Sequence, residues 1–295
     1  DVYKRQILIS LSGFEGARGD LDRAIETGME AVNTLERLDG GPSRQSLSAL
    51  GNVGLALDSA GRLDEAQALF ERELRERTAI IGPDDPEHLA ALINLGLVAL
   101  HQGRTQEARA RWTAADVVVE RYYGKRHPDR ADIALDLAWM DDAAGKHAEA
   151  ERRYAWATRV FEETLGHEAE KTLLAHSGLS TARLRQGKIQ AACRPLDALT
   201  ETARGALGET RALAILLEAR GDCAAARDKP AEAESVYRSA LDVMNQSSEP
   251  AEAQADLHLK LASTLWDQGK ESDAQALVGA LAVDTKSVEA WREAH

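Results

Sequence analysis

The sequence predicts an all-α protein, an α-solenoid of about seven antiparallel helix–turn–helix repeats. Ala and Leu are abundant, 29% of the residues are charged and only 7 are proline, a composition that favours helices over sheets or disorder. An alanine returns every 41 or 42 residues, and a turn that usually contains glycine returns at the same interval. Internal periods of this length are typical of repeat architectures.

The recurring alanine marks one position on the second helix of each repeat. It stands at Ala24, Ala66, Ala108, Ala150, Ala192, Ala233 and Ala274. Twelve positions earlier a small residue recurs, as Ser12, Gly54, Gly96, Ala138, Ser180, Gly221 and Ala262. Four positions later a mostly bulky residue recurs, as Gly28, Phe70, Trp112, Tyr154, Leu196, Tyr237 and Val278. We expect the small residue to face the alanine, with helix axes about 8 Å apart, and the bulky residue to fill the groove toward the next repeat.

The turn between the two helices has its own pattern, seen in "GRLDEA" at residues 61–66. Glycine ends the first helix at Gly19, Gly61, Gly103, Gly145, Gly187 and Gly269, where a left-handed cap is needed. Asp228 takes this place in the sixth repeat, and Asp tolerates that conformation less well than Gly. We expect the basic residue after the glycine to stabilise the negative end of the first helix, and the acidic residue before the alanine to stabilise the positive start of the second.

A second glycine connects one repeat to the next. It recurs at Gly40, Gly82, Gly124, Gly166 and Gly208, and proline follows it in "GPDDPE" and "GKRHPD". Gly therefore ends the second helix and Pro opens the following first helix. The sixth repeat departs from the pattern, because its spacing is 41 and Arg220 stands in a column otherwise held by Leu or Val. The pattern therefore does not fix the helix boundaries of this repeat.

Three segments follow from these patterns. Residues 1–6, "DVYKRQ", are interpreted as a non-native leader from a sequencing-library sequence, which would make the chain a fragment. Residues 7–283 form the repeat array. Residues 284–295 are too short for a further repeat and are expected to form a short terminal helix.

The combination of columns, turns and linkers resembles the tetratricopeptide repeat (TPR) family, and the 42-residue period resembles its kinesin light chain-like variety of bacterial type. The resemblance implies a right-handed superhelix whose first helices line a concave groove that holds peptides or helices. In the family, an asparagine before the core leucine often binds the backbone of the ligand. The matching residues that keep this capacity are Asn52, Asn94 and Asp136.

Residues three or seven positions further along each first helix should share the face of these side chains. The predicted peptide-binding residues are therefore Asn52, Leu55, Ser59, Asn94, Leu97, His101, Asp136 and Trp139. Acidic side chains are expected along the same groove at Asp58, Asp132, Asp136 and Asp142. The partner should be a neutral or basic protein segment with apolar anchors. The alternative is that Trp139 and the leucines only fill the space between helices.

Other classes of function are disfavoured. The net charge of −13 would repel nucleic acid, and no apolar run away from the termini is long enough to insert into a membrane. The histidines are scattered and no motif for nucleotide binding, metal-dependent proteolysis or serine hydrolysis is present, so no cofactor and no catalytic residue is expected. Cys193 and Cys223 are expected to be two small buried residues rather than a disulfide or a metal site.

The sequence therefore predicts a non-catalytic interaction scaffold that binds a protein or peptide segment in its groove. An alternative is the C-terminal regulatory region of a larger bacterial signalling enzyme, such as a Ser/Thr protein kinase or a signalling ATPase, whose catalytic domain is missing from this fragment. No signal peptide is visible, and the cytoplasm is the favoured location.

Overall fold

The structure is a computed structural model that describes residues 20–82, 85–247 and 251–280. Within these ranges every regular element is a helix. The chain divides into two compact units, residues 1–133 and 134–295. The proposed leader, the proposed terminal helix, Ser12 and Gly19 lie outside the described residues.

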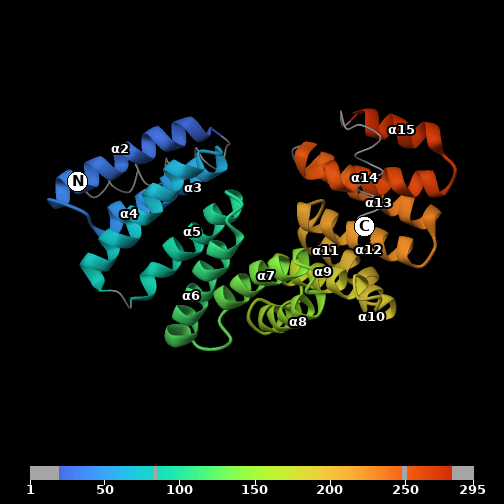
Figure 1. Ribbon diagram of the computed structural model, residues 1–295, viewed down its shortest axis with the longest axis horizontal. Coiled ribbons are helices and arrows are strands. Elements are labelled where there is room, and N and C mark those ends of the chain that lie inside the picture. The colour runs from blue at the N-terminus through green and yellow to red at the C-terminus, as the bar shows by residue number, and fades with distance from the viewer. Residues whose placement is uncertain (1–19, 83–84, 248–250, 281–295) are drawn as a thin grey trace. The chain divides into compact units, whose positions relative to one another are not determined.

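The first unit consists of successive antiparallel helices in chain order (Figure 1). They are α2 (Leu21–Asp39), α3 (Arg44–Ser59), α4 (Leu63–Ile81), the short 3-10 helix η1 (Pro86–His88), α5 (Leu89–His101) and α6 (Thr105–Tyr123). Helices α3 and α5 are first helices of their repeats, and α2, α4 and α6 are second helices. Helix α7 (Pro128–Ala143) crosses the division between the units.

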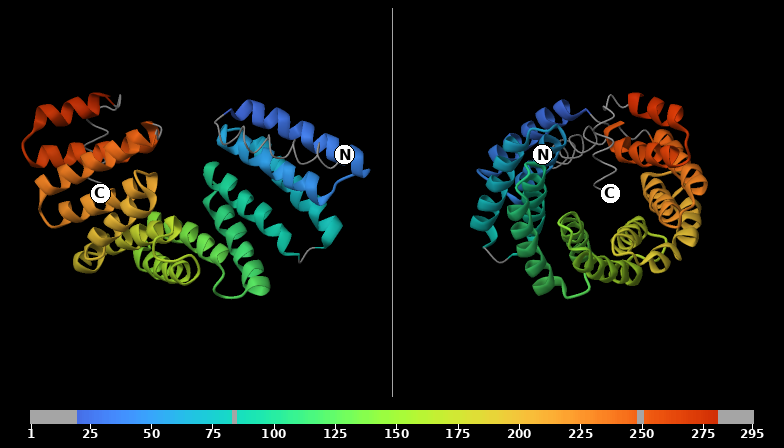
Figure 2. Two further views of the ribbon diagram at one scale, coloured as in Figure 1. Left: turned by 180° about the vertical axis from the view of Figure 1, so that it is seen from behind. Right: turned by 45° about the vertical axis from the view of Figure 1, so that its right-hand side comes forward.

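The second unit continues the same alternation, most clearly in the neighbouring helices α12 to α15 (Figure 2). Its helices are α8 (His147–Thr164), α9 (Glu170–Leu184), α10 (Ile189–Cys193), α11 (Leu196–Leu207), α12 (Arg211–Ala226), α13 (Pro230–Gln246), α14 (Ala251–Asp267) and α15 (Glu271–Ala280). First helices here are α9, α12 and α14. The prediction of antiparallel helix pairs is confirmed in both units, and the sixth repeat consists of α12 and α13.

The core confirms the alanine column and corrects its expected partner. All seven recurring alanines are buried. At Gly54, Gly96 and Gly221, however, the nearest side chain is that of the bulky residue, not that of the alanine. A Cβ atom built on Gly54 would lie 2.6 Å from the Phe70 ring, and one on Gly96 would lie 2.4 Å from the Trp112 ring. The absent side chain of each glycine thus makes room for the bulky residue of its own repeat, because an aromatic ring needs more space at the helix crossing than an alanine does.

The turn glycines from Gly61 onward adopt the predicted left-handed backbone, and the linker glycines also have positive φ. Gly61, for example, has a φ of 72°, and the next amide, on Arg62, bonds to the Leu57 carbonyl at 2.9 Å. Lys188 repeats this bond to Arg183 at 2.9 Å, so the turn is the same helix-ending motif in different repeats. Asp228 is the only non-glycine residue with positive φ among those described, at 57°.

Replacing Asp228 by Gly should therefore stabilise the sixth repeat. Glycine removes the steric cost of a side chain at positive φ but loses more backbone entropy on folding, and we expect a net gain of about 0.5–1 kcal/mol. Urea unfolding followed by circular dichroism measures the difference. The matched control is Gly187→Asp at the same position of the preceding repeat, which should be destabilised; a gain in both variants would contradict this explanation.

The basic residue after the turn does more than interact with a helix end. Arg62 donates two hydrogen bonds of 2.7 Å to Glu65, three residues further on. The same pairing joins Lys229 to Glu232 at 3.0 Å. The base and the acid of "GRLDEA" thus bind each other directly across the start of the second helix, which the sequence analysis treated as two separate interactions with helix dipoles.

The expectation for the two cysteines is wrong. Cys193 and Cys223 form a disulfide with their Cα atoms 5.6 Å apart. Cys193 ends the short helix α10, where the second helix of the fifth repeat is interrupted at Arg194 and Pro195, and Cys223 lies on α12. Proline cannot donate the backbone hydrogen bond that would continue the helix. The packing of α10 against α12, not the sequence spacing, brings the two sulfur atoms together.

Candidate functional site

In the first unit, the predicted peptide-binding residues lie on one side of the first helices. Asn52, Leu55 and Ser59 of α3 are exposed, whereas Val53 and Gly54 between them are buried. Leu55 keeps 41% of its surface exposed, so it offers apolar contact area on this side of α3. The spacing of three and four residues places these three side chains on a single face.

Helix α5 presents the equivalent positions beside α3. Asn94 and Leu97 are half-buried and His101 is exposed. His101 Nδ1 lies 2.8 Å from an oxygen of Asp58, so this pair joins the C-terminal ends of the two first helices. Because Asp58 is buried in this contact, it does not present the exposed acidic group that the sequence analysis placed in the groove.

In the second unit, Trp139 is the most exposed aromatic side chain among those described, at 54%. Asp136, one turn earlier on α7, is half-buried. Asp142 is buried, and its two oxygens lie 2.7 Å from His147 and 2.8 Å from Arg185. Like Asp58, Asp142 is engaged by neighbouring side chains, while Trp139 remains available for contact.

The apolar column that contains Trp139 ends within the second unit. Leu55, Leu97 and Trp139 occupy the same position in three consecutive repeats. The same position in the following repeats holds Thr181, Asp222 and Ser263. At this position of the described first helices, an apolar side chain is therefore present in the second, third and fourth repeats and a polar one in the later repeats.

In the last repeat, Lys260 occupies the position that Asn52 and Asn94 hold in earlier repeats, and it lies in an internal ion cluster. Lys260, on α14, contacts carboxylate oxygens of Glu218 at 2.5 Å, Asp222 at 3.0 Å and Asp256 at 3.4 Å. Burial alone would lower the pKa of Lys260, but Asp222, Glu218 and Asp256 raise it above its ordinary value. Burial raises the pKa of Glu218, and Lys260 offsets part of that rise. The ammonium group is occupied by these partners, so this cluster joins α12 to α14.

A second buried charge cluster was missed by the sequence analysis. Arg77 of α4 donates to Glu73 at 2.7 Å and to Glu87 at 3.0 Å. Burial raises the pKa of Glu73, and the hydrogen bond from Arg77 opposes that shift. Glu73 and Arg77 are four residues apart on one helix, a spacing that indicates a contact, but burial cannot be read from that spacing. The cluster ties α4 to η1 and stabilises the linker between repeats.

No group of three or more His, Cys, Asp or Glu side chains in residues 20–82, 85–247 and 251–280 is arranged to hold a metal ion. In the same part of the chain, no helix combines the length and apolar character needed to span a membrane.

Comparison with known families accounts for this arrangement. The model of the tetratricopeptide repeat family matches residues 4–75, 59–115 and 89–163, which together exceed half of the chain. The chain belongs to the tetratricopeptide repeat family. No curated protein sequence matches this TPR chain significantly.

Solved structures share the TPR fold at low sequence identity. A putative kinesin light chain from Podosopora anserina with nearly identical TPR-like repeats has a TM-score of 0.57 and 18% identity, covering 69% of this chain and 97% of its own. The apo form of the quorum sensor NprR from B. thuringiensis has a TM-score of 0.73 and 10% identity, covering 95% of this chain and 75% of its own. A Rap protein complexed with Competence and Sporulation Factor has a TM-score of 0.67 and 12% identity, covering 95% and 76%. At these identities the similarity establishes the fold, including the resemblance to kinesin light chain-like repeats.

Proposed function

We propose that this TPR protein is a non-catalytic scaffold that binds a polypeptide segment on the face of the first helices α3 and α5, and that Trp139 of the second unit is a separate contact point. The observation that carries the proposal is the exposure of Leu55 between Asn52 and Ser59 on α3, on a helix whose other side is buried. Apolar side chains that gather on a face with a polar rim mark a contact surface, and Leu97 adds a half-buried apolar side chain at the equivalent position of α5. An asparagine amide both donates and accepts a hydrogen bond, as a peptide unit does.

The chemistry of the face favours a neutral segment with apolar anchors. Asp58 and Asp142 are buried against cationic or potentially cationic partners, so they add little negative potential to the face. Leu55 and Trp139 offer apolar contact area, each from its own unit. The Rap protein solved with Competence and Sporulation Factor supports the idea that a TPR fold of this kind carries a binding surface.

Replacing Asn52 and Asn94 together by Ala should weaken capture of the partner by about 5-fold to 150-fold. The two amides would each lose a hydrogen bond to the ligand, about 0.5–1.5 kcal/mol apiece, and about 1.4 kcal/mol corresponds to a factor of ten in affinity. The measurement is quantitative mass spectrometry of proteins retained from a lysate of the source cell by immobilised wild type and by each variant. Trp139→Ala tests the apolar contact in the same way.

The matched control is Val117→Ala on the second helix α6, because Val117 is 62% exposed but does not lie on a first helix. All variants should keep the helical circular dichroism spectrum of the wild type. The proposal would be wrong if the double variant Asn52→Ala/Asn94→Ala and the single variant Trp139→Ala both retained the same proteins as the control Val117→Ala. The first-helix face would then not be the binding surface.

A further inference from the structure

Neighbouring repeats are joined by a polar contact that recurs along the array. In the second and third repeats, Gln67 follows the recurring Ala66, and its side-chain oxygen accepts hydrogen bonds from the next turn. Gln102 and Arg104, on either side of the turn glycine, donate to it at 3.4 and 2.7 Å. We call this arrangement, an acceptor after the alanine and two donors around the next turn glycine, the repeat clamp.

The repeat clamp is present twice more in the second unit. Glu151 accepts hydrogen bonds from Gln186 at 3.0 Å and Lys188 at 2.5 Å. Glu234 accepts from Gln268 at 2.9 Å and Lys270 at 2.5 Å. At Cys193, which follows Ala192, the disulfide to Cys223 takes the place of the clamp acceptor.

The junction between the first and second repeats lacks this contact. Ile25 follows Ala24 and offers no acceptor, and Ala60 stands where Gln102 donates in the next repeat. Arg62 directs two hydrogen bonds to Glu65 of its own helix. The hydrogen bonds that join Gln67, Glu151 and Glu234 to the following turn therefore have no counterpart at Ile25.

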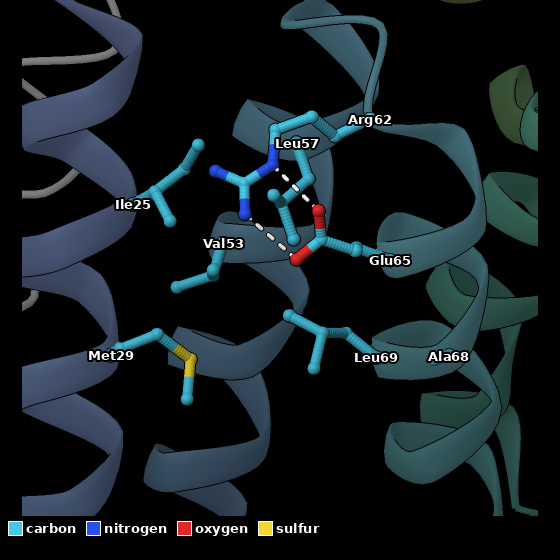
Figure 3. Close-up of a pocket in the computed structure, with 8 residues that line it drawn as sticks. All are labelled: Ile25, Met29, Val53, Leu57, Arg62, Glu65, Ala68 and Leu69. Atoms are coloured by element: carbon cyan, nitrogen blue, oxygen red, sulfur yellow. Dashed lines mark hydrogen bonds and ion pairs between the residues drawn. The ribbon is translucent and has the colours of Figure 1, made fainter.

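A pocket of about 320 Å³ occupies this junction (Figure 3). Its apolar walls are formed by Ile25, Met29, Val53, Leu57, Ala68 and Leu69. The Arg62–Glu65 ion pair also lines the pocket. Because α2 and α4 are second helices, and Val53 and Leu57 lie on the buried side of α3, the pocket is separate from the first-helix face around Leu55.

We propose that this pocket binds one uncharged, apolar side chain of a partner polypeptide. Its volume is at the small end of ligand pockets, which begin at about 300 Å³, so it suits a single bulky group better than a large cofactor. The ion pair has no net charge, and both of its members are already hydrogen-bonded, so a charged ligand would find no unpaired opposite charge there. Met29 adds a flexible wall that adapts to aromatic or branched aliphatic groups.

Methyl NMR tests the proposal with few signals. The chain has 3 methionines, of which Met29 lines the pocket while Met140 and Met244 are buried elsewhere. Full-length protein labelled with ¹³C at the methionine methyl groups is titrated with N-acetyl-tryptophanamide and, separately, with N-acetyl-leucinamide. We expect a saturable shift of the Met29 signal alone, and none with the charged probe N-acetyl-lysinamide. Unchanged Met29 with both apolar probes, or equal shifts of all three signals, would overturn the proposal.

A pair of variants ties the signal to the pocket. Ala68→Leu places a larger side chain in the pocket and should abolish the Met29 shift. Ala110→Leu makes the same change at the same position of the next repeat, where the repeat clamp on Gln67 is intact, and should leave the shift unchanged. A shift retained in Ala68→Leu would show that the probe binds elsewhere.

Sedimentation velocity identifies the source of the occupant. The free protein should show no concentration-dependent association that depends on this pocket. Self-association that Ala68→Leu removes and Ala110→Leu preserves would assign the pocket to a second copy of the chain and overturn the assignment to a foreign partner.

Discussion

Loss of the disulfide between Cys193 and Cys223 should lower the free energy of unfolding by about 3–4 kcal/mol. The bond closes a segment of 30 residues that contains the interrupted second helix of the fifth repeat. Without it, the unfolded chain gains the entropy of that loop, and the short helix α10 loses its covalent link to α12. The effect is measured by guanidinium unfolding of the wild type with and without a reductant.

The double variant Cys193→Ser/Cys223→Ser is the control. Its free energy of unfolding should equal that of the reduced wild type and should not change when the reductant is added. Hydrogen exchange should locate the loss of protection in α10, α11 and α12. Equal stability of the oxidised and reduced wild type would show that packing alone holds this junction. Since cellular reductants keep most cytosolic thiols reduced, the bridge contributes only where the protein meets oxidising conditions.

Replacing Gly96 by Ala should destabilise the first unit by about 2–4 kcal/mol. The new Cβ atom would lie 2.4 Å from Nε1 of Trp112, a buried ring that cannot move freely. Overpacking typically costs about 1–3 kcal/mol. Displacement of the ring would also strain its 3.1 Å hydrogen bond to the Ile93 carbonyl, worth about 0.5–1.5 kcal/mol. Thermal unfolding and the near-ultraviolet signal of Trp112 report the change.

The chain provides a matched control for this substitution. Gly205 lies inside helix α11 with no atom within 4 Å of an added Cβ, so Gly205→Ala should be neutral or slightly stabilising. Adding Trp112→Phe to Gly96→Ala should recover part of the loss, because the smaller ring vacates the space that the new methyl group requires. A neutral Gly96→Ala would mean that the helix crossing does not depend on the missing side chain.

The repeat architecture was predictable because its signals are local and occur many times. Each of these signals follows from the conformational or packing preference of one residue, as in the alanine column, the turn glycines and the substitution of Asp228. Because the pattern recurs in seven repeats, a chance match at one position does not alter the prediction. The face formed by Asn52, Leu55 and Ser59 was predictable for a similar reason, since helix periodicity alone places them together.

Contacts between residues far apart in the sequence were less predictable. The sequence analysis expected Gly96 to face an alanine, and it expected no disulfide between Cys193 and Cys223. It also treated Asp58 and Asp142 as exposed acids in a groove, whereas the structure buries both against neighbouring side chains. Each of these relations depends on how one helix is rotated and shifted against its neighbour, which the 42-residue period does not specify.

The sequence by itself determined the helices, the turns and the order of the repeats, because backbone preferences and periodic burial act within each repeat. Only the tertiary structure decided which side chains meet between repeats. Gln67, Glu151 and Cys193 all follow the recurring alanine, yet two accept hydrogen bonds from the next turn and one forms a disulfide. At the same position Ile25 has no side-chain acceptor, and an apolar pocket lies beside it, lined also by the Arg62–Glu65 ion pair.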